Sequence, residues 1–228
     1  MSRLAIVLLT YTDDTHGPRA EYAHRTLRSA LDNVVTSCDI SVHIADDGSP
    51  EEHRQALIHL AGGYAHVRGI SVTNAQRGGY GRSYNLATQT VHRHVDYVLP
   101  LEDDWVLEAP LNIDPYLAAM SAPNGPGCIR LGYIGMTQEL RGLLVPFAGN
   151  MYLMFDPDSP EPHVFAGHPR LETVAWERRV GPWPEGVSAG TTEFLVAHKR
   201  EARERVAWPM NRGPFAHVGT VQARTDQQ

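Results

Sequence analysis

The 228-residue sequence contains only two cysteines, Cys38 and Cys128, and neither belongs to a CxxC pair. Cysteines this far apart predict neither a disulfide framework nor a cysteine-based zinc site, so both are interpreted as small apolar fillers. An HExxH motif is also missing, which argues further against zinc.

Long hydrophobic runs are missing at the start of the chain. The first apolar run, LAIVLL at 4–9, has only six residues. A run of this length is too short for the core of a signal peptide or for a membrane span, but it has the length of a strand. We therefore expect a soluble, cytoplasmic protein with no membrane span.

Positive charge is scarcer than negative charge, with 20 Lys and Arg against 26 Asp and Glu, and Lys199 is the only lysine. The formal net charge of -6 disfavours a general nucleic-acid or membrane-surface binder. The composition, 42% hydrophobic and 20% charged, is typical of a globular chain. Without repeats or an evident linker, the sequence predicts one domain over 1–228.

The first hundred residues alternate between apolar runs of strand length and amphipathic stretches. The sequence predicts strands at 4–9, 40–45, 67–73 and 97–101, and helices at 19–34, 50–62 and 82–94. Ser49 is expected to cap the second helix. This alternation predicts an α/β fold with an open, mostly parallel sheet flanked by helices. The carboxyl ends of its strands form one edge, where ligands bind.

The second half of the chain is less regular. We expect helices at 114–120, 171–180 and 191–206, strands at 128–136 and 143–155, and a proline-rich loop at 156–163.

Three acidic clusters fall at the predicted edge: Asp13 with Asp14, Asp46 with Asp47, and the run Glu102-Asp103-Asp104. A triple acid at a strand end points either into water or toward a cation. Mg²⁺ or Mn²⁺ suits it, because such ions take one or two carboxylates and fill their other positions with phosphate oxygens and water. His217 is a candidate further ligand or a structural histidine.

A glycine-rich segment at 78–81 joins the same edge. It lacks the spacing and lysine of a phosphate-binding Walker A loop, and Tyr84 breaks the dinucleotide fingerprint. Two interpretations are left. Its amides, with Arg77 or Arg82, approach an anion at a helix start, or the glycines only permit a turn.

Taken in order, four motifs resemble those of GT-A fold glycosyltransferases of the family-2-like group. They are LTYTDD after the first strand, ADDGS after the second, QRGGYGRSYNLA at a helix start and LEDDW after the fourth strand. A weaker similarity extends through ETVAWERRVGPWPEGVSAGTTEFL, toward the acceptor-side ED motif of that group. The resemblance implies a nucleotide-sugar-binding half at 1–106 and an acceptor-binding half at 107–228.

The resemblance also implies residue roles. Donor-binding positions are Thr10, Tyr11, Thr12, Asp46, Asp47, Arg77, Gly78, Asn85 and Asp103. Asp104 would hold the metal, while Glu102 has no assigned role. The resemblance does not assign His217, which stays the candidate second ligand because it lies among apolar and glycine residues. On the acceptor side ED becomes Thr192-Glu193, so Glu193 takes the position of the catalytic base.

The sequence therefore predicts a divalent-cation-dependent, inverting transfer of a sugar from a nucleoside-diphosphate sugar to an unknown hydroxyl-bearing acceptor. Two alternatives are kept. A sugar-phosphate nucleotidyltransferase also combines an α/β sheet with metal-binding acids, although its basic glycine-rich amino-terminal loop is poorly matched by LLTYTDDTHGPR. A non-catalytic nucleotide-sugar or glycan binder would explain the altered ED motif.

Overall fold

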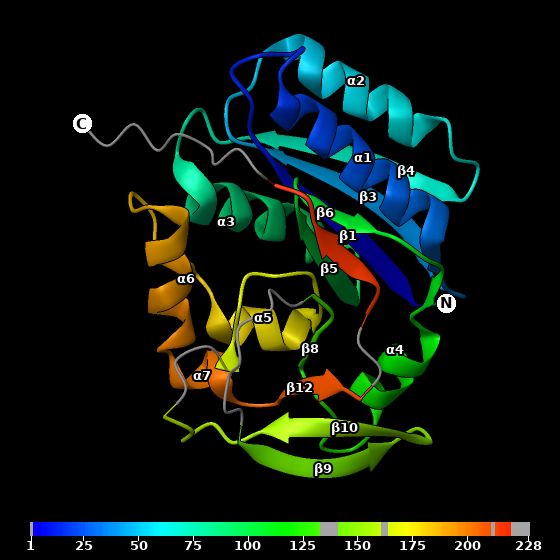
Figure 1. The fold of residues 1–228 in the computed structure, drawn as a ribbon, viewed down its shortest axis with the longest axis vertical. Helices are drawn as coiled ribbons and strands as arrows, with labels where there is room; N and C mark the ends of the chain where they lie inside the picture. Colours follow the sequence, from blue (N-terminus) through cyan, green and yellow to red (C-terminus); the bar gives the residue numbers. More distant parts are fainter. Residues whose placement is uncertain (1, 133–140, 161–163, 211–212, 220–228) are drawn as a thin grey trace.

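The computed structural model describes residues 2–132, 141–160, 164–210 and 213–219. Its centre is a nine-stranded sheet with the order β4-β3-β1-β5-β11-β8-β12-β10-β9 (Figure 1). The first four strands of this order are mutually parallel: β4 (Val67–Asn74), β3 (Asp39–Asp46), β1 (Arg3–Thr10) and β5 (Tyr97–Glu102).

The second half of the chain extends the same sheet with mixed strand directions. β11 (Arg170–Thr173) runs antiparallel to both β5 and β8 (Cys128–Arg130), and β12 (Val206–Pro209) is parallel to β8. A hairpin of β9 (Gly142–Phe147) and β10 (Asn150–Phe155) completes it. Two short pairs lie outside it, β6 (Trp105–Leu107) with β13 (Phe215–His217) and β2 (Val34–Val35) with β7 (Leu111–Asn112).

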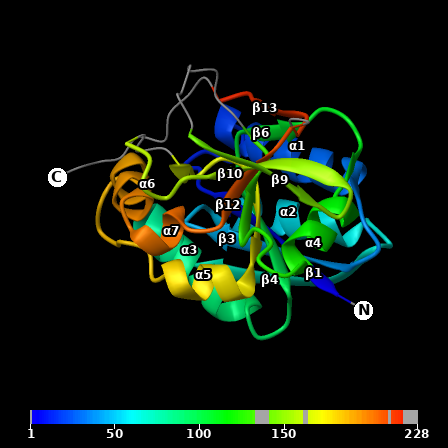
Figure 2. The ribbon, with the colours of Figure 1, turned by 90° about the horizontal axis from the view of Figure 1, so that it is seen from below.

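Helices cover both faces of the sheet (Figures 1 and 2). One face packs against α1 (Pro18–Asn33), α2 (Glu51–Gly62) and α4 (Asp114–Ser121). The other packs against α3 (Gly79–Val91), α5 (Val174–Val180), α6 (Ala189–Ala197) and α7 (Arg200–Arg203). Alternate residues of β1 enter the two cores, which is why its sequence is apolar throughout.

These layers confirm the predicted α/β class with an open sheet flanked by helices. The four predicted amino-terminal strands are present. Within the described residues, no helix combines the length and apolarity needed to cross a bilayer.

Two predictions about helix starts were wrong. The N-cap of α2 is Pro50, and the Ser49 hydroxyl accepts a hydrogen bond from the Thr12 amide instead of capping the helix. The helix expected at 82–94 begins earlier, at Gly79, and ends at Val91.

Three predictions for the second half were also wrong. Residues 143–155 form a hairpin because Ala148 and Gly149 have positive φ and reverse the chain. Residues 171–173 belong to β11, since they pair with β5 and β8, and helix begins only at Val174. The helix expected at 191–206 is interrupted by the extended Lys199 and ends before Arg205, which has positive φ.

β8 is shorter than the predicted strand and ends at Arg130. Residues 133–136 of that prediction lie outside the described residues, as do residues 161–163 of the predicted proline-rich loop.

Candidate active site

The strand register brings the acidic clusters together at one edge of the sheet. Thr10 pairs with Asp46, Asp46 pairs with Asn74, and Leu9 pairs with Glu102. The four parallel strands therefore end side by side, as the alternating sequence predicts, and the residues that follow them line one edge.

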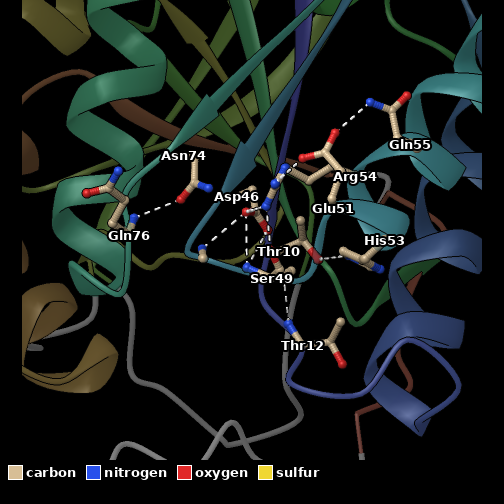
Figure 3. A network of polar contacts seen from close by, with 11 residues as sticks. Thr10, Thr12, Asp46, Ser49, Glu51, His53, Arg54, Gln55, Asn74 and Gln76 are labelled. Atoms are coloured by element: carbon tan, nitrogen blue, oxygen red, sulfur yellow. Dashed lines mark hydrogen bonds and ion pairs between the residues drawn. The ribbon is translucent and has the colours of Figure 1, made fainter.

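Asp46 lies at the centre of a buried polar network at this edge (Figure 3). Its carboxylate is fully buried and accepts hydrogen bonds from the amides of Gly48 and Ser49 and from Arg54 Nη1, at 3.1 to 3.2 Å. Ser49 in turn accepts from the Thr12 amide at 3.0 Å. Asp46 thus fixes the turn between β3 and α2.

Asp47 holds the glycine-rich segment beside that turn. Its two carboxylate oxygens accept from the Gly79 amide at 3.0 and 3.1 Å. Burial raises the pKa of Asp47, and the hydrogen bond from Gly79 acts in the opposite direction. Gln76 and Arg77 both have positive φ, a conformation that costs free energy for residues other than glycine.

Arg77 lies over the ring of Tyr11, with its guanidinium carbon 3.9 Å from the ring centre. Its own amide donates to the Asp47 carbonyl at 3.1 Å. Tyr11 follows β1, so a cation stacked on an aromatic ring joins the ends of β1 and β4.

Asp103 points into the protein, with only 1% of its surface exposed. It forms an ion pair with Arg19 of α1 and accepts from the Thr10 hydroxyl and the Tyr11 amide, both at 3.3 Å. Burial raises the pKa of Asp103 to about 7, while the charge of Arg19 opposes this rise. The carboxylate therefore ties α1 to the end of β1.

Asp104 points away from Asp103, toward His217. His217 Nε2 lies 3.3 Å from Asp104 Oδ2, because β13 pairs with β6 and places His217 opposite Trp105. Asp104 Oδ1 is buried and has no hydrogen-bond partner among the described residues. A buried carboxylate oxygen without a partner is costly, and a bound cation would satisfy it.

Metal binding at this position would depend on few protein ligands. No group of three or more His, Cys, Asp or Glu side chains in the described parts of the chain is arranged to hold a metal ion. Mg²⁺ and Mn²⁺ sites that rely on substrate phosphates need only one or two protein ligands, so Asp104 and His217 fit such an ion.

Glu102 and Glu193 meet around Gly167. A Cβ atom on Gly167 would lie 3.1 Å from Glu102 Oε1 and 3.4 Å from Glu193 Oε1. The Gly167 amide donates to Glu193 Oε1 at 2.5 Å. Burial raises the pKa of Glu102 to about 8, and the nearby charges of Asp104 and Glu193 add to the effect. Glu193 is thus brought from α6 to the acids that follow β5.

Asn85 joins α3 to the segment that precedes α6. Its amide nitrogen donates to the Trp183 carbonyl at 3.0 Å and to Glu185 Oε1 at 2.7 Å, and its oxygen accepts from the Trp183 amide at 2.8 Å. Only 5% of Asn85 is exposed, so its polar atoms serve this contact.

Comparison with solved structures identifies the architecture. TarS from S. aureus superposes with a TM-score of 0.67 over 96% of this chain and 37% of its own, at 13% identity. A TarS fragment, 1-349, in complex with UDP-GlcNAc superposes with a TM-score of 0.65. The match covers 97% of this chain and 62% of that one, also at 13% identity. The chain has a GT-A-like glycosyltransferase fold.

A mannosyltransferase from Pyrobaculum calidifontis in complex with GDP-Man and Mn²⁺ shares this GT-A-like fold, with a TM-score of 0.52 at 14% identity. The match covers 90% of this chain and 56% of that one. The chain thus spans from about a third to under two thirds of the structures that it matches. Protein-family models and curated sequences give no match.

Within the GT-A-like fold, the predicted site residues divide into two groups. Tyr11, Asp47, Arg77, Gly78, Asp104 and His217 are partly or fully exposed at the edge. Thr10, Thr12, Asp46, Asn85 and Asp103 are buried, each with at most 5% exposed. The hydrogen bonds of Thr10, Thr12, Asp46 and Asp103 hold the ends of β1 and β3, and those of Asn85 hold the segment before α6. Their assignment to donor binding stays a prediction.

Several residues of the site carried no signal that we used. Arg19 is one of many arginines in the sequence, and Gly167 lies in no motif. In the segment 170–173, Arg170 belongs to no predicted element and Glu172 falls in the predicted helix at 171–180. Only the pairing of β11 with β5 shows that this segment begins at the edge where the acids lie.

Proposed function

We propose that this protein is a metal-dependent, inverting glycosyltransferase that moves a sugar from a nucleoside-diphosphate sugar to a hydroxyl-bearing acceptor. One observation carries this proposal. In a GT-A-like fold, the acids at the end of β5 include a buried Asp104 oxygen that has no hydrogen-bond partner in the described parts of the chain, and the Glu102 and Glu193 carboxylates both lie next to Gly167.

Donor binding is assigned to the residues at the amino-terminal edge, within 1–106. The stacked pair Tyr11 and Arg77 would line the nucleobase pocket, and Gly78, whose amide donates to the Ala75 carbonyl, would let the backbone approach the phosphates. The solved relatives support a nucleoside-diphosphate donor, since TarS is described with UDP and UDP-GlcNAc and the mannosyltransferase with GDP-Man.

The buried members of the predicted donor site act by positioning. Asp103 and Thr10 hold the end of β1, and Asp46 and Thr12 hold the turn after β3. Loss of one of these groups would move the ligand-facing loops without removing a direct contact.

Asp104 and His217 would hold Mn²⁺ or Mg²⁺ on the opposite side of the edge. The ion, when bound, neutralises charge on the departing nucleoside diphosphate. Asp104 contributes the anionic ligand, and the edge-to-face contact of His217 with Trp105, with ring centres 5.2 Å apart, orients its imidazole.

Glu193 takes the proton of the acceptor hydroxyl as that oxygen attacks the sugar. It belongs to the half proposed to bind the acceptor, 107–228. The Gly167 amide fixes one carboxylate oxygen and leaves the other to receive the proton.

The experiment pairs Asp104→Ala with Glu193→Gln. Calorimetry with UDP, GDP and dTDP, with and without Mn²⁺, measures nucleotide binding. Mass spectrometry measures turnover of nucleotide sugars. We expect Asp104→Ala to lose the Mn²⁺-dependent part of nucleotide binding together with turnover. Glu193→Gln should bind nucleotide normally and lose turnover by about 100-fold or more.

Retention of Mn²⁺-dependent binding by Asp104→Ala would remove the metal assignment, and retained turnover by Glu193→Gln would remove the base assignment. Nucleotide-sugar binding without turnover by the wild type would favour a binding protein. Formation of a nucleotide sugar from a sugar phosphate and a nucleoside triphosphate would favour the nucleotidyltransferase alternative.

A further inference from the structure

A buried ion pair is linked to Glu193 through the backbone of Gly167. Arg170 and Glu172 of β11 are both fully buried, with Arg170 Nε 2.5 Å from Glu172 Oε1. The Tyr84 hydroxyl donates to Glu172 Oε2 at 2.5 Å. Buried ion pairs contribute little net folding free energy, because desolvation offsets the attraction, and apolar replacements are often as stable. Stability alone is therefore a weak reason for these two charges.

One further donor of Arg170, Nη1, reaches the segment before β11, while Nη2 is buried without a hydrogen-bond partner among the described residues. Its Nη1 donates to the Gly167 carbonyl at 2.7 Å and to the His168 carbonyl at 3.4 Å. The guanidinium also faces the rings of Phe165 and Trp183 at 5.0 and 5.2 Å, so packing and hydrogen bonds together fix its orientation.

The direction of β11 explains why the contact between Arg170 and the Gly167 carbonyl lies next to the acids. β11 is antiparallel to β5, with Glu172 opposite Val98, so residues that precede β11 lie beside the acids that follow β5. A Cβ atom at Gly167 would meet both carboxylates, Glu102 and Glu193. The Gly167 amide and carbonyl belong to successive planar peptide units joined at its Cα, so a held carbonyl restrains the amide that donates to Glu193.

We propose that Arg170 is a positioning residue for Glu193. It holds the Gly167 carbonyl, so that the Gly167 amide presents its hydrogen bond to Glu193 Oε1. The catalytic meaning of this arrangement rests on the proposed function, whereas the arrangement itself does not. Glu172 and Tyr84 serve to orient Arg170.

The structural arm of the test uses NMR of the Gly167 amide. Because this amide donates to a carboxylate through a short hydrogen bond, its proton should resonate downfield. Glu193→Gln should move the signal upfield, which verifies its assignment. Arg170→Lys keeps the charge and removes the forked geometry, and it should move the signal in the same direction.

A double variant separates positioning from an unpaired buried charge. Arg170→Met with Glu172→Gln removes both charges and keeps an acceptor for Tyr84, so it should fold and again move the Gly167 signal upfield. Arg205→Met is the matched control, because Arg205 Nε also donates to a glycine carbonyl, that of Gly125, at 2.7 Å. It should leave the Gly167 signal in place.

The catalytic arm compares turnover with nucleotide binding. The Arg170 variants should lower kcat by on the order of 100-fold, as expected for a displaced catalytic group, with unchanged affinity for UDP or GDP in Mn²⁺. Arg205→Met should change neither. An unmoved Gly167 signal in both Arg170 variants would overturn the proposal, as would a moved signal with wild-type kcat. A wild type without any turnover would instead refute the proposed function, and the NMR arm would still decide the geometry.

Discussion

The Asp104 carboxylate lies so close to Gly219 that a side chain at position 219 would collide with it. A Cβ atom on Gly219 would lie 2.3 Å from Asp104 Oδ2, far inside van der Waals contact. The Val218 amide donates to the Asp104 carbonyl at 2.9 Å, which keeps the two segments together. The glycine therefore leaves space for the carboxylate that we assign to the metal.

Gly219→Ala is expected to displace the Asp104 carboxylate and to weaken Mn²⁺-dependent UDP or GDP binding by about 10- to 100-fold. Calorimetry with and without Mn²⁺ measures this change. Gly69→Ala is the control, because a Cβ atom there meets nothing within 4 Å. Equal metal-dependent affinity in the wild type and Gly219→Ala would contradict the assignment of Asp104.

The sequence identified the acids and named His217 as a candidate ligand beside Asp104, but it did not identify Arg19 as the partner of Asp103. Glu102, Asp103 and Asp104 were recognisable because three consecutive carboxylates after an apolar run need a reason. The direction in which each carboxylate points depends on contacts with residues far away in the sequence. Asp103 pairs with Arg19, 84 residues away, while Asp104 faces His217. No local pattern indicates which acid turns inward.

At the scale of elements, α3 and the segment 183–185 form a joint between the two halves of the site. A Cβ atom on Gly81 would lie 1.9 Å from the Pro184 carbonyl oxygen, so α3 touches this segment directly. The hydrogen bonds of Asn85 close the same contact. Since the segment leads into α6, it also determines where α6, the helix that carries Glu193, begins.

Asn85→Ala should loosen this joint. It leaves the buried Trp183 amide without its acceptor, which costs about 1–3 kcal/mol of unfolding free energy. Hydrogen exchange measured by mass spectrometry should accelerate at 183–191 and not at β1. Asn150→Ala removes the hydrogen bond of an exposed loop asparagine and should change neither region. Uniform acceleration over the whole chain would indicate global destabilisation and contradict a local joint.

The elements that the sequence misassigned are those whose type depends on partners. Residues 171–173 have helical neighbours, yet they pair with strands on both sides and become β11. The amino-terminal strands were predicted correctly because buried parallel strands have continuous apolar sequences. A strand that carries Arg170 and Glu172 has no such pattern.

At the scale of the whole molecule, a buried histidine links stability to pH. His43 of β3 is fully buried, and its ring nitrogens lie 2.8 Å from the Ser71 hydroxyl and 3.0 Å from the Thr73 hydroxyl. Burial lowers the pKa of His43 from 6.5 to about 4. Between pH 4 and pH 6.5, the His43 imidazole is therefore protonated in the unfolded chain and neutral in the folded protein.

As the pH is lowered from 6.5 toward 4, His43 should contribute a loss on the order of 3 kcal/mol to the free energy of unfolding. The raised pKa values of Asp103 and Glu102 act in the opposite direction, so the His43 contribution is the difference between the wild type and His43→Gln. Above pH 6.5 the histidine is neutral in both states and contributes no slope. Chemical denaturation at several pH values measures the effect. His43→Gln should show a shallower loss, and the exposed His59→Gln should match the wild type. Parallel curves for the wild type and His43→Gln would contradict the prediction.

The sequence by itself determined the α/β class, the edge at which ligands bind and the order of the acidic motifs along it. These features follow from hydrophobic periodicity and chain direction, which are local properties. Only the tertiary structure decided which predicted residues are exposed at this edge and which are buried behind it. It also revealed Gly167 and Arg170 beside Glu193. The reason is that hydrogen bonds and ion pairs depend on distances in space, and here the antiparallel β11 sets them.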